Sequence, residues 1–401
     1  MPVVAAPPPI AAAQAPAPPV VLAYSYAPGG IVGDRSGHRF PTRVDGVLAV
    51  PPTPGPHPVA FIFHGSYPSC IWPARERTLS RTLSVVRWPS RCWDRRHAGP
   101  QGTYGPYAVR WEASFAGMAR ALADRGVAAV AIDVATKENT EWGEADRTVT
   151  QRRLFDLHLR VLRSLNAGNG RGIALPAGVR GSLDLTRIAA VGHSSGGGFV
   201  LSQLEATRTR QRILPGLRAV VGVQPAAGYL TRGAFSNPVP ALIIGSRCDE
   251  QIPWRDTNQV AARTVTRNGS TPTVFVGLGN TLHLSTVGGG NPRVGPTDPV
   301  ETPECTTALA APAAVRAQES ALVADFVSQA LSGARSFALR AGPSVPVEVR
   351  RATPGLVVTT EPTLAEGMPA EVPANRVRFR ASPFRWLPPA PRRLSGGAAG
   401  T

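Results

Sequence analysis

The sequence predicts an α/β fold with a mostly parallel central sheet that is flanked by helices on both faces. Short apolar runs typical of buried strands alternate along the chain with longer segments of helical periodicity. The strand candidates are residues 46–50, 58–63, 127–132, 188–191, 217–223, 241–245 and 274–276. The helix candidates are residues 111–125, 144–165, 199–206, 254–267 and 315–331. In such sheets, functional residues gather at the carboxyl ends of the strands.

The chain divides into three parts by composition. Residues 1–30 are rich in Ala and Pro and are expected to be a disordered tail, and residues 31–333 carry the α/β pattern. Residues 334–401 form a Pro- and Arg-rich extension in which only short β-like pieces are expected, so it is predicted to be β-rich or irregular. Within the α/β part, the Gly- and Pro-rich loop 285–312 is long enough to form a lid or a binding-site wall.

The most informative motif is Gly192-His193-Ser194-Ser195-Gly196, which follows an apolar run and precedes a helix candidate. A serine on a sharp strand-to-helix turn adopts strained backbone angles, and glycines around it let neighbouring chain pass closely. The motif predicts that Ser194 is a nucleophile at the end of a strand, with its Oγ lifted clear of the sheet. The alternative is a plain strand-to-helix turn without chemistry.

A serine hydroxyl needs a general base, and the base needs an orienting carboxylate. On this scaffold both partners follow the nucleophile in the chain, and His283 is the only histidine after Ser194. The carboxylates between these two residues are Glu205, Asp249, Glu250 and Asp256. Asp249 is the best candidate because it lies in the loop after the strand candidate 241–245. Taken singly, a loop Asp is usually a turn former and a loop His is usually solvated.

A fourth feature concerns the oxyanion that forms when the serine attacks a carbonyl carbon. The strand candidate 58–63 ends in His64-Gly65-Ser66. Two preorganised N–H donors are required, and we assign them to the backbone of Ser66 and Ser195. His64 is expected to shape this loop rather than to transfer a proton, and the alternative for the whole segment is a simple turn.

Together these motifs resemble the α/β-hydrolase superfamily over about residues 32–331. The order of features is similar to secreted bacterial esterases of the dienelactone-hydrolase, cutinase and platelet-activating-factor-acetylhydrolase kind. The segment from His64 to Cys70, with Cys92 after it, resembles a subgroup with a disulfide-bridged loop beside the oxyanion strand. The resemblance implies an α/β-hydrolase fold and a serine esterase without a cofactor or metal. One departure is that Asp249 stands four residues after Gly245 instead of three, so Glu250 stays a competitor for the acid.

The four cysteines, Cys70, Cys92, Cys248 and Cys305, allow three pairings, and the sequence alone does not choose among them. Pairing of neighbours would join Cys70 to Cys92 and Cys248 to Cys305. Disulfides imply a secreted or cell-envelope protein, although no standard signal peptide is evident; four free thiols in a cytosolic enzyme are the alternative. No cysteine spacing indicates a zinc site.

The net charge of +17 does not by itself identify a partner. Of 43 basic residues 42 are Arg, dispersed over the chain, as a GC-rich genome would produce. No nucleic-acid-binding motif accompanies them, so no nucleic-acid partner is expected, and no apolar run is long enough for a transmembrane helix. Attraction to acidic surfaces is compatible with the charge. We therefore expect a monomeric hydrolase of small, lipid or polymeric esters, with an acyltransferase or a non-catalytic binding protein as the alternatives.

Overall fold

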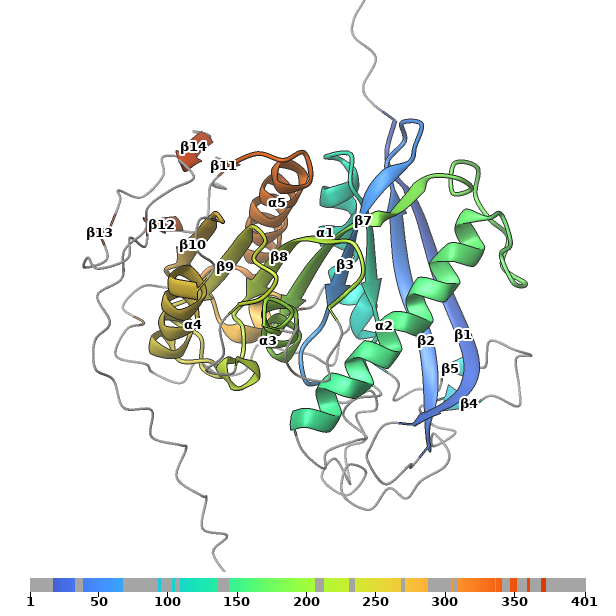
Figure 1. The fold of residues 1–401 in the computed structure, drawn as a ribbon, viewed down its shortest axis with the longest axis horizontal. Helices are drawn as coiled ribbons and strands as arrows, with labels where there is room; N and C mark the ends of the chain where they lie inside the picture. The colour runs from blue at the N-terminus through green and yellow to red at the C-terminus, as the bar shows by residue number, and fades with distance from the viewer. Residues whose placement is uncertain are drawn as a thin grey trace, which may run out of the picture.

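The structure is a computed structural model. It describes residues 17–32, 39–67, 93–94, 103–104, 109–135, 144–205, 213–230, 235–267, 271–287, 305, 309–335, 337–340, 347–351, 359–360 and 369–372. The predicted alternation of strands and helices is confirmed over these residues, and the chain has an α/β fold (Figure 1).

Among the described residues, the main sheet has ten strands in the order β1-β2-β6-β3-β7-β8-β9-β10-β12-β13. Their bounds are β1 Val20–Val32, β2 Arg39–Val50, β3 His57–Phe63, β6 Ala128–Ile132, β7 Leu183–His193, β8 Leu217–Val223, β9 Ala241–Ser246, β10 Thr273–Leu278, β12 Val347–Arg351 and β13 Thr359–Thr360. The strands from β6 to β10 in this order run parallel, whereas β1, β2, β12 and β13 pair antiparallel with their neighbours. Two small antiparallel pairs lie apart from it: β4 (Trp93–Asp94) with β5 (Thr103–Tyr104), and β11 (Phe337–Arg340) with β14 (Pro369–Val372).

Helices cover both faces of the sheet (Figure 1). The sheet separates two clusters of buried apolar residues, one on each face. One apolar cluster lies under α1 (Ala116–Ala123) and α5 (Pro312–Leu331), which contact each other. The other lies under α2 (Glu144–Asn166), α3 (Ser195–Ser202) and α4 (Trp254–Arg267). The parallel strands are buried on both faces, which explains why they are continuous apolar runs rather than alternating ones.

The first strand corrects the expected boundary of the N-terminal tail. Residues 20–30 were expected to be disordered, but they belong to β1, which pairs with β2. The side chains of Leu22, Tyr24 and Tyr26 alternate inward and are buried. Ala and Pro dominate the composition only up to residue 19. The composition averaged over residues 1–30 therefore conceals the alternation of buried and less buried side chains that begins at Leu22.

The other boundaries differ by a few residues. The expected helix 111–125 is a 3-10 turn, η2 (Trp111–Phe115), followed by α1. Part of the C-terminal extension is β structure, because β12 adds to the edge of the main sheet beside β10. Within the extension, residues 373–401 lie outside the described residues, as does most of the loop 285–312.

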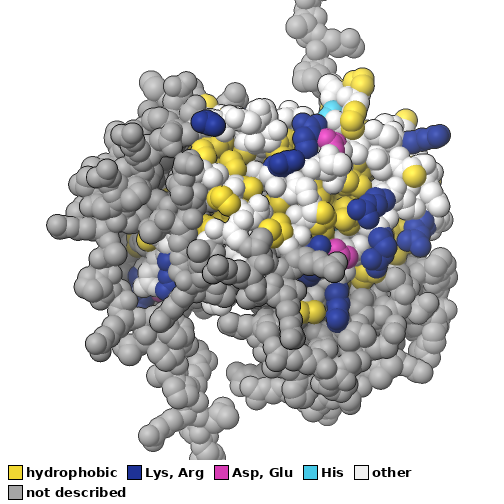
Figure 2. All heavy atoms as spheres, viewed as in Figure 1, with side chains coloured by type: hydrophobic (Ala, Val, Ile, Leu, Met, Phe, Trp, Pro, Cys, Tyr) yellow, Lys and Arg dark blue, Asp and Glu magenta, His cyan; other side chains and the backbone are white. Residues whose placement is uncertain are grey.

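The described surface carries its positive charge in a dispersed form. Figure 2 shows arginine side chains spread among apolar and polar ones over one face, with acidic groups between them. None of the helices in the described part of the chain is both long and apolar enough to cross a membrane.

Candidate functional site

Ser194 occupies a strained turn between the end of β7 and the start of α3. Its backbone angles are φ 56° and ψ −124°, a region that residues other than glycine rarely adopt. Such a conformation costs about 1–3 kcal/mol and persists only where neighbours enforce it. Here the Ser194 N–H donates to the carbonyl of Val223 at 3.0 Å, and the Ser194 carbonyl accepts from Gly198 and Ala226. The turn is therefore held from both β8 and α3.

The loop after β3 packs directly against this turn. A Cβ at Gly196 would lie 2.5 Å from the carbonyl oxygens of Phe63 and His64, so only glycine allows this approach. A Cβ at Gly65 would likewise lie 2.8 Å from the Cβ of Ser194. The two glycine-bearing motifs found in the sequence thus meet in space.

His283 and Asp249, which the sequence separates by a strand and a helix, are hydrogen-bonded. Nδ1 of His283 lies 2.8 Å from Oδ2 of Asp249, and both side chains are buried. The other oxygen of Asp249 accepts the N–H groups of Gln251 and Ile252 at 2.9 and 2.6 Å. Because Asp249 receives three donors, its orientation is fixed. Nε2 of His283 is buried and has no hydrogen-bond partner among the described residues, so it makes no hydrogen bond with the Ser194 hydroxyl in this structure.

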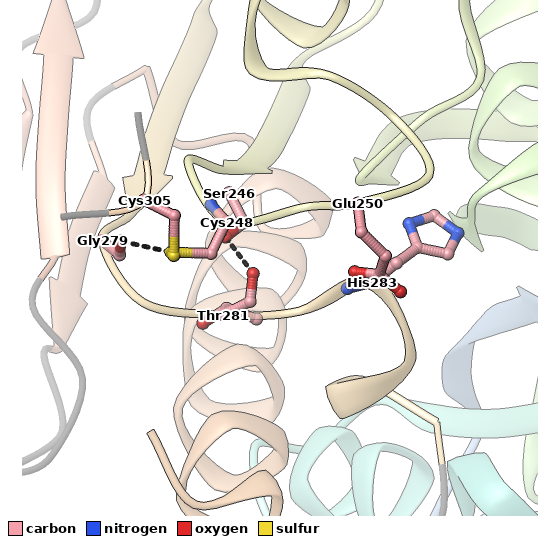
Figure 3. The surroundings of a disulfide bond; sticks show 7 residues. All are labelled: Ser246, Cys248, Glu250, Gly279, Thr281, His283 and Cys305. Atoms are coloured by element: carbon pink, nitrogen blue, oxygen red, sulfur yellow. Dashed lines mark hydrogen bonds between the residues drawn. A yellow bond between two sulfur atoms is a disulfide. The ribbon is translucent and has the colours of Figure 1, made fainter. Parts of the chain in front are cut away.

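Glu250, the competing acid, contacts the same histidine differently. Its Oε2 accepts the backbone N–H of His283 at 2.9 Å, so it anchors the chain rather than the ring. Close by, Cys248 and Cys305 form a disulfide with a Cα–Cα distance of 4.7 Å. Figure 3 shows this disulfide at one end of the acid and histidine loops, with Glu250 and His283 at the other. The loops are also joined by a hydrogen bond from the Ser246 hydroxyl to the Thr281 carbonyl.

Two residues that the sequence motifs did not assign to the site, His193 and Gln224, lie beside His283. The ring of His193, beside Ser194, lies 4.6 Å from the ring of His283, centroid to centroid. His193 is hydrogen-bonded through Nδ1 to the Tyr67 hydroxyl at 2.7 Å and through Nε2 to Oε1 of Gln224 at 3.0 Å. Burial, followed by the charge of His283, holds the pKa of His193 well below its usual range, so this imidazole stays neutral. Gln224 follows β8 directly with a φ of 44°, a position at a strand end that could have drawn attention to it.

The predicted oxyanion residues lie next to each other. The Ser66 hydroxyl donates to the Ser195 hydroxyl at 2.8 Å; Ser66 is exposed and Ser195 is buried. His64, behind this pair, has Nδ1 2.8 Å from the Gly65 carbonyl and Nε2 3.0 Å from Oδ1 of Asp133. It is therefore fixed within the loop, as expected of a residue that shapes it.

The carboxylate behind His64 belongs to a buried charge cluster. Asp133 lies 3.2 Å from the guanidinium of Arg43, and both side chains are fully enclosed. Burial opposes the ionisation of Asp133, but its bond to His64 and the Arg43 charge hold its pKa below the usual range. The loop after β3 consequently rests on a charged, hydrogen-bonded support.

The second expected cysteine pair, Cys70 and Cys92, lies outside the described residues. Neither family models nor curated proteins give a match for this chain.

Proposed function

We propose that this protein is a serine hydrolase of carboxylic esters with an α/β-hydrolase fold. The observation that carries the proposal is the 2.8 Å contact between Asp249 and His283, on loops beside a serine in a strained strand-to-helix turn. A charged acid, an oriented imidazole and an enforced serine turn are the three parts that nucleophilic catalysis by serine requires.

In the proposed reaction, Oγ of Ser194 attacks the ester carbonyl carbon while Nε2 of His283 takes the hydroxyl proton. Negative charge develops on the carbonyl oxygen, where the backbone N–H groups of Ser66 and Ser195 would donate to it. Collapse breaks the bond to the alcohol, which leaves with the proton from His283. Water then attacks the acyl-enzyme by the same steps in reverse roles and releases the acid and free Ser194. Asp249 stabilises the imidazolium in both halves.

Export to an oxidising compartment is part of the proposal. The Cys248–Cys305 disulfide supports it, since such bonds persist outside the reducing cytosol. The proposed substrates are carboxylic esters of a small molecule, a lipid or a polymer.

The test is labelling with a fluorophosphonate, followed by peptide mapping. The proposal predicts one modified serine, Ser194, and hydrolysis of p-nitrophenyl esters by the same preparation. A folded protein that neither labels nor hydrolyses any ester of a series of acyl lengths would overturn it in favour of a binding protein. Transfer of the acyl group to an added alcohol in preference to water would instead identify an acyltransferase.

A further inference from the structure

A chain of buried polar side chains connects helix α5 to the histidine beside the nucleophile. Oε1 of Glu319 lies 3.1 Å from the Thr286 hydroxyl, which lies 3.1 Å from Oε1 of Gln224. The same Gln224 oxygen lies 3.0 Å from Nε2 of His193, whose Nδ1 meets the Tyr67 hydroxyl at 2.7 Å. All five side chains are buried. Because every hydrogen bond needs one donor and one acceptor, the hydrogen positions on these five side chains depend on one another.

The contacts define the direction of the chain. Nε2 of Gln224 faces the carbonyl of Leu282 at 3.5 Å, which leaves its oxygen toward Thr286 and His193. That oxygen can only accept, so Thr286 donates to it, and His193 carries its hydrogen on Nε2. A hydroxyl has one proton, so Thr286 cannot also donate to Glu319. The carboxyl of Glu319 must hold a proton and donate to Thr286.

The surroundings of Glu319 are compatible with a protonated acid. Burial is the main cause that raises its pKa, to about 8; the hydrogen-bond contact with Thr286 opposes this, the charge of Asp249 adds to it and that of Arg316 opposes it. Its second oxygen is buried without a hydrogen-bond partner among the described residues. Charged or titratable groups on the elements around it are Arg316 on α5, Arg120 on α1, Asp249 after β9, His193 on β7 and His283 in η5 (His283–Ser285).

Glu319 also lines a cavity of about 410 Å³ between α1 and α5. Ser114, Arg120, Thr286 and Ser320 contribute to the same wall. The polar side chains among its lining can bind water, which gives the buried carboxyl a route for proton exchange with solvent.

We propose that Glu319 is a positioning residue whose proton sets the direction of the Thr286 hydroxyl, and thereby how Gln224 holds the ring of His193 against His283. When Glu319 gives its proton to solvent base, the carboxylate can only accept. Thr286 then turns its hydrogen to Glu319, and Gln224 loses one of its two donors. Its remaining donor is the Nε2–H of His193, so this hydrogen bond changes on a ring whose centroid lies 4.6 Å from that of His283. This inference rests on the proposed esterase function for its kinetic consequence, but not for the hydrogen-bond rearrangement itself.

The kinetic experiment measures the rate constant of fluorophosphonate labelling of Ser194 against pH. The wild type should show a transition near pH 8, because Glu319 ionises there. Glu319→Gln carries no ionisable group and should lose this transition while labelling at neutral pH within about twofold to threefold of wild type. Thr286→Val removes the hydroxyl that links Glu319 to Gln224. It should lower the labelling rate constant about twofold to tenfold, the value of one hydrogen bond, and remove the transition.

The matched control is Asp325→Asn on the same helix. Asp325 pairs with Arg125 at 2.9 Å and is not one of the five hydrogen-bonded side chains. Its substitution should therefore lower stability and leave the pH dependence of labelling unchanged. An unchanged profile in Glu319→Gln, or the same change in Asp325→Asn, would overturn the inference.

A second measurement does not depend on activity. Nitrogen NMR of histidine-labelled protein should find hydrogen on Nε2 of His193 at neutral pH. The chemical shift of this nitrogen should change as pH passes about 8, and Glu319→Gln should abolish the change. Hydrogen on Nδ1 at neutral pH would reject the assignment. Absence of Ser194 labelling at every pH, with these NMR changes present, would reject the esterase proposal alone.

Discussion

The Nδ1 atom of His283 lies 2.8 Å from a carboxylate oxygen of Asp249, while the neighbouring Glu250 accepts from the backbone N–H of the same histidine. The two acids adjoin in the sequence but hold different parts of their partner. Asp249 contacts the imidazole ring and Glu250 contacts the backbone. We therefore expect substitutions of these two acids to have unequal effects on kcat.

Removal of the proposed nucleophile is the first prediction. Ser194→Ala should lower ester hydrolysis by several orders of magnitude with little loss of stability, as removal of a catalytic serine does elsewhere. Ser202→Ala is the matched control, because Ser202 is a buried serine on α3 whose hydroxyl donates to the Phe199 carbonyl and accepts from the side chain of Gln203. Its kcat should stay near that of wild type. If Ser194→Ala kept more than about a tenth of wild-type kcat/KM, another residue would be the nucleophile.

The second prediction compares the two acids. Asp249→Asn should lower kcat strongly, though less than Ser194→Ala, because an unoriented imidazole keeps some basicity. Glu250→Gln keeps an oxygen that can accept the His283 N–H, so kcat should change by no more than about threefold, the value of a weakened hydrogen bond. Steady-state kinetics on one p-nitrophenyl ester decide the matter. A larger loss for Glu250→Gln than for Asp249→Asn would make Glu250 the catalytic acid.

The disulfide is the subject of the third prediction. It closes a span of 57 residues, so its loss in Cys248→Ser with Cys305→Ser should lower the free energy of unfolding by about 4 kcal/mol in the chain-entropy model. Activity should fall under mild reductant at temperatures where circular dichroism still reports a folded sheet, because the bridge fastens the residue next to Asp249. Non-reducing peptide mapping verifies the bond. Parallel loss of activity and fold would show that the bridge has no separate effect on the site.

The fourth prediction concerns stability in acid. The Nδ1 atom of His158 meets the Tyr24 hydroxyl at 2.8 Å, and burial lowers the His158 pKa from 6.5 to about 4, opposed by the charge of Asp133. The folded protein therefore takes up this proton less readily than the unfolded chain. Stability from His158 is present above pH 6.5 and is lost as pH falls toward 4.

The variant His158→Asn tests this sign, because the Asn oxygen can replace Nδ1 as acceptor without titrating. Its free energy of unfolding, measured in denaturant, should decline less steeply than that of wild type between pH 6.5 and 4. Identical slopes for the two proteins would contradict a neutral, buried His158.

Much of the α/β framework could be predicted because its signal is local. The strand Leu217–Val223 and the helix Trp254–Arg267 have the bounds that their apolar patterns indicate. By contrast, β1 was missed where a composition rich in Ala and Pro concealed a short alternation. The pairing of β12 with β10 depends on contacts between residues 69 to 75 positions apart, which no local pattern contains.

The site divides in the same way. Ser194, Asp249 and His283 each follow a recognisable strand, so their order in the chain was enough to select them. Gln224, Thr286 and Glu319 come from three separate elements and have no characteristic spacing. Their hydrogen bonds exist only after the sheet and α5 are assembled, and a buried glutamate in a helix otherwise resembles any surface glutamate in sequence.

The Cys248–Cys305 bond also affects how damage to the chain would be detected. The span between these cysteines includes α4, β10 and His283, so one cut by a protease there would leave two pieces covalently attached. Intact mass would then rise by a single water, and a non-reducing gel would register no fragment. A cleaved preparation could therefore lose the geometry of the His283 loop and still migrate as the full-length protein on a non-reducing gel. Purity of this protein is therefore best assessed on reducing gels.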